Sequence, residues 1–203
     1  MKHRDFLVTG DGRYQVCKPS REWDLLREPY RLHRFLTEVE DVLERATDEN
    51  QCLPQLRLLV RRLIVNSYWI HVHHPEPCPR SGNSTIILYD EIGYPLTVQT
   101  TTLTSGTVSP IHNHGTWGIV AVLQGEEKNT FWKRSPTAGF LNRIARVSEM
   151  TLLPGDIISF TPDAIHCVEA LGEEPTITFS IYGETHHSRR YQFDPLTCTA
   201  KNF

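Results

Sequence analysis

The sequence lacks the features that would indicate a membrane, a secretory route or a nucleic-acid partner. No stretch approaches the run of about 18 apolar residues that a membrane-spanning helix needs. Residues 1–15 contain no apolar segment long enough for a signal peptide. Positive charge is not in excess either, because 21 Lys and Arg residues stand against 24 Asp and Glu residues. We therefore expect a cytoplasmic protein that binds neither membranes nor nucleic acid.

Closely spaced cysteines are also absent. The five cysteines are odd in number, and no two of them have the C-x-x-C spacing of a zinc knuckle or a redox motif. Free thiols in a reducing compartment are the plain interpretation.

The composition supports one packed domain. The chain has 203 residues, of which 39% are hydrophobic and 22% charged, so a core is feasible and disorder is not the default. No repeat or linker divides the sequence. We expect a single domain over 1–203, with a helical part at about 20–66 and a β-barrel at about 84–195. A monomer and a homodimer are both compatible with this pattern.

The helical part is indicated by the spacing of its apolar residues. Between 32 and 43 they recur at steps of three and one and so line one helix face. A second apolar set over 53–64 predicts another helix, with Pro54 near its start. Two to three helices therefore open the chain.

After a proline-rich crossing the pattern changes to short segments rich in Ile, Val, Thr and aromatic residues. Turn signals such as SGNS, QGEE and LPGD separate them. The predicted strands are 85–89, 96–103, 118–123, 129–133, 143–153, 156–160 and 176–182. Seven or more short strands at this spacing are typical of a sandwich or barrel. The helices should then pack on the outside of one β domain.

Three of the ten histidines stand in positions that suit a metal site. His112 and His114 lie two apart in SPIHNHGTWGIV, so both point to the same side of an extended backbone. His166, in PGDIISFTPDAIHCVE, follows a turn, a strand and a second turn. Neutral imidazoles suit Fe, Zn, Cu or Ni. The sequence predicts one metal ion held by these three side chains; the alternative is three histidines on loop tips or in a polar barrel mouth.

Two stretches resemble the paired motifs of the cupin superfamily. Residues 106–125 follow the pattern G-x5-H-x-H-x3-G-x6-G, and 155–166 resemble the second motif, one residue shorter before the histidine. One departure is Gly118, at which many cupins place a glutamate ligand. The resemblance implies an all-β, double-stranded β-helix (cupin, jelly-roll barrel) with an N-terminal helical appendage.

With glycine at 118 the predicted site has three neutral imidazoles and no acidic ligand. The charge of a divalent metal would then not be offset, and coordination positions would remain open for an anionic ligand and dioxygen. HNHGTWGIVAVLQGEE and SIYGETHHSRRYQFDP resemble the thiol dioxygenases, particularly the bacterial cysteine and 3-mercaptopropionate dioxygenase-like branch. The similarity runs from about 20 to 195. It implies a non-haem Fe(II) enzyme, in which Ni or Zn could replace iron in a purified sample. Such an enzyme uses dioxygen to oxidise a small thiol-bearing carboxylate to its sulfinic acid.

The thiol dioxygenases keep a Ser-x-His-x-Tyr row on a late strand, which here becomes Thr178, Ser180 and Tyr182 on one strand face. The resemblance makes Tyr182 the catalytic candidate beside the metal and places Thr178 and Ser180 next to the substrate. Ser180 replaces the family's histidine, and a hydroxyl cannot hold the charge that an imidazole can. The alternative for Tyr182 is a barrel tyrosine anchored by its hydroxyl.

Substrate contacts are also implied by the resemblance. The mammalian-type carboxylate-binding arginine has no counterpart in 84–87, whereas the bacterial branch takes its arginine from the segment that holds Arg189 and Arg190. The alternative is a solvated basic pair. Trp117 follows the ligand turn and is expected either at the pocket wall or as a buried barrel aromatic. The mammalian-type cysteine–tyrosine crosslink should be absent, because Gly118–Ile119 stand at the cysteine's position.

Two other functions remain open from the sequence. One is a cupin oxygenase for a different small substrate, such as a diketone, which the replacement of the family's histidine by Ser180 keeps open. The other is a non-catalytic cupin that binds a metabolite or senses a metal.

Overall fold

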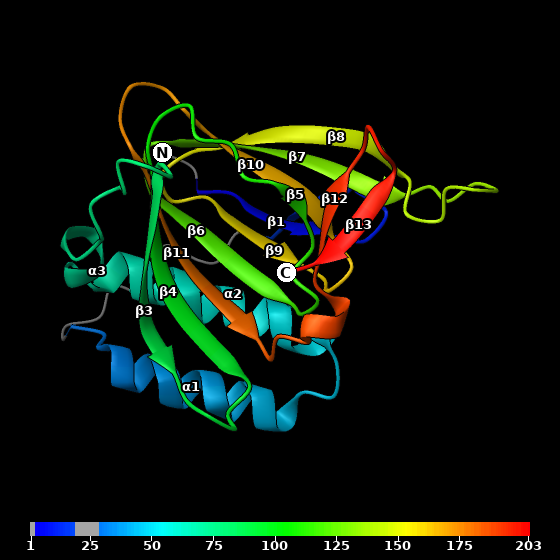
Figure 1. Cartoon of the computed structure of the whole chain (residues 1–203). Coiled ribbons are helices and arrows are strands. Elements are labelled where there is room, and N and C mark those ends of the chain that lie inside the picture. Colours follow the sequence, from blue (N-terminus) through cyan, green and yellow to red (C-terminus); the bar gives the residue numbers. More distant parts are fainter. Residues whose placement is uncertain (1–2, 19–28) are drawn as a thin grey trace.

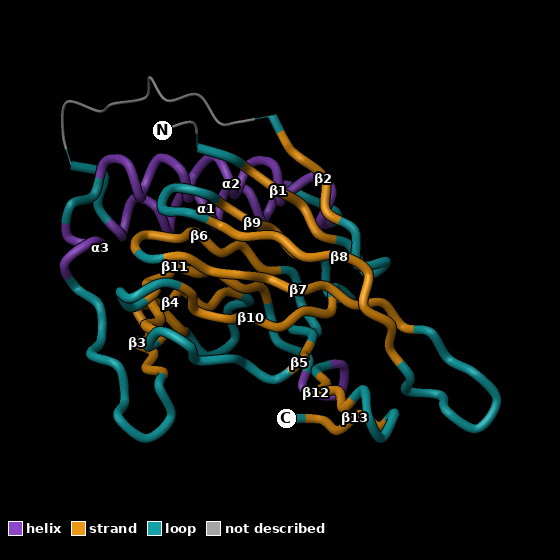
Figure 2. Tube along the Cα trace, turned by 90° about the horizontal axis from the view of Figure 1, so that it is seen from above, coloured by secondary structure: helices purple, strands orange, loops and turns teal. Residues whose placement is uncertain are grey.

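The computed structural model describes residues 3–18 and 29–203. Within these ranges the chain forms two facing β-sheets, and its helices cover the outer face of the larger sheet (Figures 1 and 2). The part of the predicted helical segment at 20–28 lies outside the described residues.

Among the described residues, the larger sheet has seven strands and the smaller sheet has six. The first has the order β2 (Tyr14–Cys17), β1 (Asp5–Val8), β9 (Ile157–Phe160), β6 (Gly118–Gln124), β11 (Thr176–Gly183), β4 (Leu96–Leu103), β3 (Asn83–Asp90). The second has the order β13 (Thr199–Asn202), β12 (Tyr191–Asp194), β5 (Ile111–His112), β10 (Ile165–Leu171), β7 (Glu126–Arg134), β8 (Ile144–Leu152). All seven strands expected from the sequence are present, with small shifts at their ends.

The order of the central strands identifies the fold. From β4 to β11 the chain passes back and forth between the sheets, so that β4-β11-β6-β9 faces β5-β10-β7-β8, with antiparallel neighbours. Two interleaved antiparallel layers of this kind form the double-stranded β-helix of cupins. The predicted fold class, with its N-terminal helical appendage, is confirmed.

The helices are α1 (Leu32–Arg45), α2 (Glu49–Asn66) and the short α3 (Trp69–Val72). Helix α2 begins at Glu49 because the Asp48 side chain accepts a hydrogen bond from the Gln51 N–H at 3.1 Å, which caps the helix. This start is earlier than expected, so the prediction that Pro54 lies near the start is wrong: it lies inside the helix. None of the helices in the described ranges is long and apolar enough to cross a membrane.

Strand alternation divides the core into two layers. On β6, Ile119 and Ala121 pack against the buried face of α2, whereas Val120 and Val122 pack between the sheets. Burying a large apolar side chain stabilises the fold by about 1.5–3 kcal/mol. Because the inward face of β6 also carries Gly118, this alternation decides which residues can face the interior between the sheets.

Candidate metal centre

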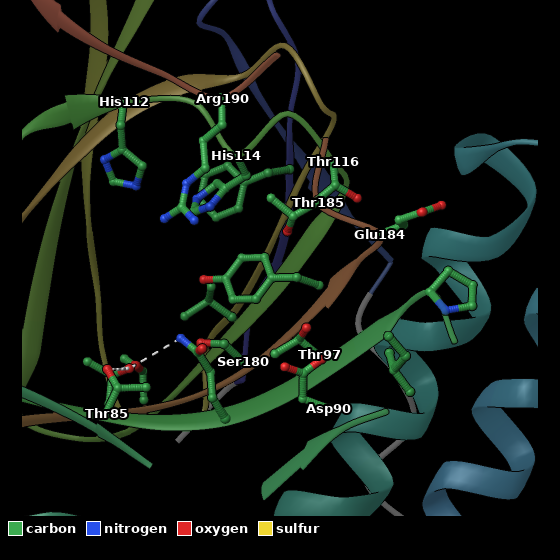
Figure 3. Close-up of a pocket in the computed structure, with 18 of the residues that line it drawn as sticks. Thr85, Asp90, Thr97, His112, His114, Thr116, Ser180, Glu184, Thr185 and Arg190 are labelled. Atoms are coloured by element: carbon green, nitrogen blue, oxygen red, sulfur yellow. Dashed lines mark hydrogen bonds between the residues drawn. The ribbon is translucent and has the colours of Figure 1, made fainter. Parts of the chain in front are cut away.

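The three predicted ligands converge between the sheets. His112 ends β5, His166 is the second residue of β10, and the two are directly paired across the strands. His114 follows in the turn after β5. One ligand nitrogen from each of the three histidines lies within 4.8 Å of the other two, and no carboxylate joins this group among the described residues. Figure 3 shows His112 and His114 at one side of the cavity.

Hydrogen bonds fix the tautomers of two ligands. The Nδ1–H of His112 donates to the Pro110 carbonyl at 2.8 Å, and the Nδ1–H of His166 donates to Asn129 Oδ1 at 2.9 Å. The Asn129 amide cannot flip without losing hydrogen bonds, because its Nδ2 donates to a Glu127 carboxylate oxygen at 2.7 Å. Both histidines therefore present an Nε2 lone pair to the centre, because a hydrogen-bond acceptor on Nδ1–H fixes the tautomer and orientation of a metal-binding imidazole.

The spacing of the nitrogens suits a metal ion. His114 Nε2 and His166 Nε2 are 3.0 Å apart. Two nitrogens at about 2.1 Å from one metal, at right angles, are separated by about 3.0 Å. Burial lowers the pKa of His114 and of His166 well below the usual value, and neighbouring imidazoles act in the same direction. Burial also lowers the pKa of His112; the hydrogen bond to Pro110 opposes this shift, and the charge of Arg190 adds to it. The three side chains thus stay neutral, and the donor set fits Fe, Zn, Cu or Ni.

Gly118 is required by a neighbouring ring. It is paired with Tyr182 on one side and Phe160 on the other. A Cβ at 118 would lie 2.8 Å from two carbons of the Tyr182 ring. That ring lies 4.8 Å from the His114 ring, with an interplanar angle of 31°. The tyrosine ring therefore fills the space that a side chain at 118 would need, and the chain cannot offer an acidic ligand from this position.

The ligand turn, residues 112–115, also makes hydrogen bonds and close backbone contacts with the segment that carries the two arginines. Asn113, buried between the two histidines, donates to the Arg189 carbonyl at 2.9 Å and accepts from the Tyr191 N–H at 2.8 Å. Gly115 has a φ of +66°, and a Cβ there would lie 3.0–3.1 Å from the Arg189–Arg190 backbone. Only glycine combines that backbone angle with such a close approach.

Arg190 is placed to bind an anion. It is half-buried, and its guanidinium carbon lies 4.2 Å from the Phe203 ring centroid. Its Nε–H is buried without a hydrogen-bond partner, and burial lowers the pKa of the group. In the described part of the chain no carboxylate forms an ion pair with it. Figure 3 shows Arg190 beside the two histidines.

These groups line a cavity of about 890 Å³. Thr178, Ser180 and Tyr182 all face it from β11, as strand periodicity predicted, and Arg190 is the one Lys or Arg among its described lining residues. Burial raises the pKa of Tyr182 to about 12; its hydrogen bond with Ser180 opposes the shift, and the charge of Glu127 adds to it. The Tyr182 hydroxyl therefore keeps its proton at neutral pH.

Two candidate residues lie elsewhere. Trp117 packs in the core beneath the helices, on the opposite face of β6 from Gly118. Arg189 is exposed in the short 3₁₀ turn His187–Arg189 and does not line the cavity. Of the two consecutive arginines, Arg190 lines the cavity and Arg189 does not.

The sequence interpretation missed Glu127, Asn129 and Asn113. Glu127 and Asn129 alternate on β7 with buried Phe131, so a period of two in E-K-N-T-F marks one inward face. The predicted strand begins only at 129, which leaves Glu127 in the turn. Asn113 had no signal beyond its position between the ligands.

No protein-family model matches the chain. Among solved structures, an oxalate oxidase in complex with the substrate analogue glycolate is similar at 10% identity over 57% of each chain, with a TM-score of 0.42. A cupin superfamily protein from Desulfitobacterium hafniense matches at 14% identity over 55% of this chain and 92% of its own, with a TM-score of 0.41. A double-stranded β-helix protein from Klebsiella pneumoniae matches at 16% identity over 57% and 83%, with a TM-score of 0.44. The match thus covers little more than half of the oxalate oxidase chain, and the fold assignment rests on the strand order.

Proposed function

We propose that this protein is a non-haem Fe(II)-dependent thiol dioxygenase. The reaction is RSH + O₂ → RSO₂H, in which the sulfur loses four electrons to dioxygen and gains both oxygen atoms. The observation that carries the proposal is the combination, around one cavity, of three neutral imidazoles and of Arg190, which pairs with no carboxylate among the described residues. Its substrates are a small thiol-bearing carboxylate and dioxygen.

The donor set supports this chemistry. Fe(II) held by His112, His114 and His166 would supply a Lewis-acidic centre at which a thiolate and dioxygen meet. Because no acidic ligand offsets the charge, the site favours an anionic sulfur ligand over a neutral one. The hydrogen bonds from His112 and His166 to Pro110 and Asn129 keep the nitrogens directed at the centre.

The remaining groups position the substrate. Arg190 offers a planar guanidinium with one buried, unused N–H, which suits a carboxylate. Tyr182 stays protonated and can donate a hydrogen bond to a bound oxygen atom or carboxylate. Ser180 beside it can pass on a hydrogen bond but cannot store a proton as an imidazole does. Holding the thiol and the carboxylate at two fixed points supplies the proximity term of catalysis.

The direct test is oxygen uptake by anaerobically Fe(II)-loaded protein against cysteine, 3-mercaptopropionate, cysteamine and a diketone, with sulfinate measured by mass spectrometry. We expect one oxygen molecule consumed for each sulfinate formed with a thiol-bearing carboxylate. His166→Ala should abolish both metal retention and turnover. Near-stoichiometric metal in that variant, or oxygen uptake without any sulfinate, would refute the proposal.

The size of the cavity favours a second candidate, a cupin oxygenase of a larger or non-thiol substrate such as a diketone. A volume of about 890 Å³ falls in the range for drug-sized ligands, and a three-carbon thiol acid fills only part of it. Uptake of oxygen with the diketone alone would select this function. Metal-dependent ligand binding with no turnover of any panel member would instead indicate a binding protein.

A further inference from the structure

A buried carboxylate faces the cavity without a counter-charge. Glu127 is 4% exposed and lines the cavity from β7, on the face that also carries Asn129. The other carboxylates that line the cavity, Asp90, Glu91 and Glu184, are exposed at its mouth. Water can solvate those three, whereas Glu127 depends on what the protein or a ligand provides.

The protein provides a single neutral partner. One Glu127 oxygen accepts a hydrogen bond from Asn129 Nδ2 at 2.7 Å, and in the described part of the chain no Lys, Arg or His forms an ion pair with it. The nearest cation in sequence, Lys128, points away and pairs with Glu149 and Glu169 at 3.6 and 3.4 Å. A buried carboxylate that is neither paired nor fully hydrogen-bonded is strongly disfavoured in its charged form.

This arrangement has the form of an incomplete ion pair. A carboxylate kept only for packing would be replaced at lower cost by an apolar or amide side chain of the same shape. Here the carboxylate is instead held in orientation by Asn129, and its other oxygen is available to the cavity. Both hydrogen bonds of the chain Glu127–Asn129–His166 are buried, so the acid also has a fixed position relative to the metal ligands.

We propose that Glu127 is a binding site for a cationic group of the ligand, a primary ammonium, inside the same cavity. This inference rests on the proposed function and deepens it. A substrate would place its thiolate at the metal, its carboxylate at Arg190 and its ammonium at Glu127. The three contacts together select an amine-bearing thiol acid over its amine-free counterpart. A ligand without the ammonium would place an apolar group beside Glu127 and leave the buried carboxylate charge unpaired.

The test compares two thiols that differ by the amine, cysteine and 3-mercaptopropionate, in binding to Co(II)-loaded protein without oxygen. The thiolate-to-cobalt absorption band reports occupancy. In the wild type we expect cysteine to bind roughly tenfold or more tightly than 3-mercaptopropionate. Glu127→Gln, which keeps the shape and the hydrogen bond with Asn129, should remove that preference and leave 3-mercaptopropionate within about twofold. Glu126→Gln, which changes an exposed carboxylate on the same strand outside the cavity lining, is the matched control and should change neither.

Several outcomes separate the two proposals. Equal effects of Glu127→Gln on both thiols, or no effect on either, would overturn the ammonium site while thiol binding stands. If neither thiol gives the band in the wild type, the thiol function fails, and ethylammonium then serves as a thiol-free probe. The ¹³C signal of the Glu127 carboxyl should shift with ethylammonium and not with propionate; no shift would overturn the site. Metal content is measured for each variant, and if the Gln variant loses metal, the ethylammonium titration of the wild type decides the site.

Discussion

The charged carboxylate of Glu127 should destabilise the folded protein at neutral and higher pH. The size of this effect follows from the burial of the side chain. Desolvation raises the pKa of this carboxyl from 4.5 to about 7, with the Asn129 hydrogen bond opposing the shift. The folded state therefore holds a proton that the unfolded state releases, and stability falls as pH rises from about 4.5 to 7. At about 1.4 kcal/mol for a tenfold change in proton affinity, the penalty above pH 7 is up to about 3 kcal/mol.

Glu127→Gln removes this penalty, because the amide keeps the acceptor for Asn129 and carries no charge. We expect the metal-free variant to match the wild type near pH 4 and to be more stable by up to about 3 kcal/mol at pH 8. Urea unfolding followed by circular dichroism over pH 4–8 measures the difference. Glu126→Gln, which changes the exposed neighbour on the same strand, is the control and should stay within about 0.5 kcal/mol of wild type throughout.

The comparison has a clear contrary outcome. If Glu127→Gln gains no stability relative to wild type between pH 5 and pH 8, the carboxylate is not desolvated in the folded protein. A loss of stability at every pH would mean that the charged Glu127 carboxylate is already paired within the protein. It would then need no cation from the ligand. A gain confined to high pH supports the interpretation that binding, rather than stability, keeps this residue acidic.

Four further substitutions and one mass measurement test the site. Asn129→Leu removes the acceptor of the ligand His166 and should lower metal affinity roughly 10–100-fold, measured by competition with a chelating dye. Arg190→Gln should raise KM and lower kcat/KM roughly tenfold or more for a thiol acid, whereas Arg189→Gln should have little effect and cysteamine turnover should not respond to either change. Gly118→Ala places a Cβ 2.8 Å from the Tyr182 ring and should lower the free energy of unfolding by about 1–3 kcal/mol in urea titrations. Intact-mass and peptide analysis should find Tyr182 unmodified, since a two-hydrogen deficit joining it to a cysteine would contradict the absence of a crosslink.

Periodicity carried most of the sequence-based prediction. Alternation placed His112 and His114 on one side of the chain and Thr178, Ser180 and Tyr182 on one strand face, and the structure has both sets facing one cavity. The same rule, applied to consecutive residues, would have excluded Trp117: it neighbours Gly118 on the chain, so it must face the helices if Gly118 faces the cavity.

Other features could not be obtained from local pattern. Strand β5 is two residues long, and β1 joins the sheet through parallel pairing with β9 across about 150 residues of sequence. Such short elements exist because of tertiary partners and carry little propensity of their own. Pro54 lies in the interior of helix α2 because the Asp48 cap starts the helix before the apolar pattern begins. The Glu127–Asn129–His166 chain depends on the register of β7 against β10, which a single sequence does not specify.

The ligand turn shows how metal binding and substrate binding become one structural unit. In the sequence H-N-H-G the two histidines face the cavity, so the side chain of Asn113 between them faces away from it. There it binds backbone groups of the segment around Arg190. Gly115 then lets that segment pack directly against the turn. A shift of the turn must move the metal ligands and the guanidinium together. The distance between the metal and Arg190 is therefore set by backbone contacts and not by the flexible arginine side chain alone, and this is the geometry that a substrate with a fixed thiol-to-carboxylate spacing requires.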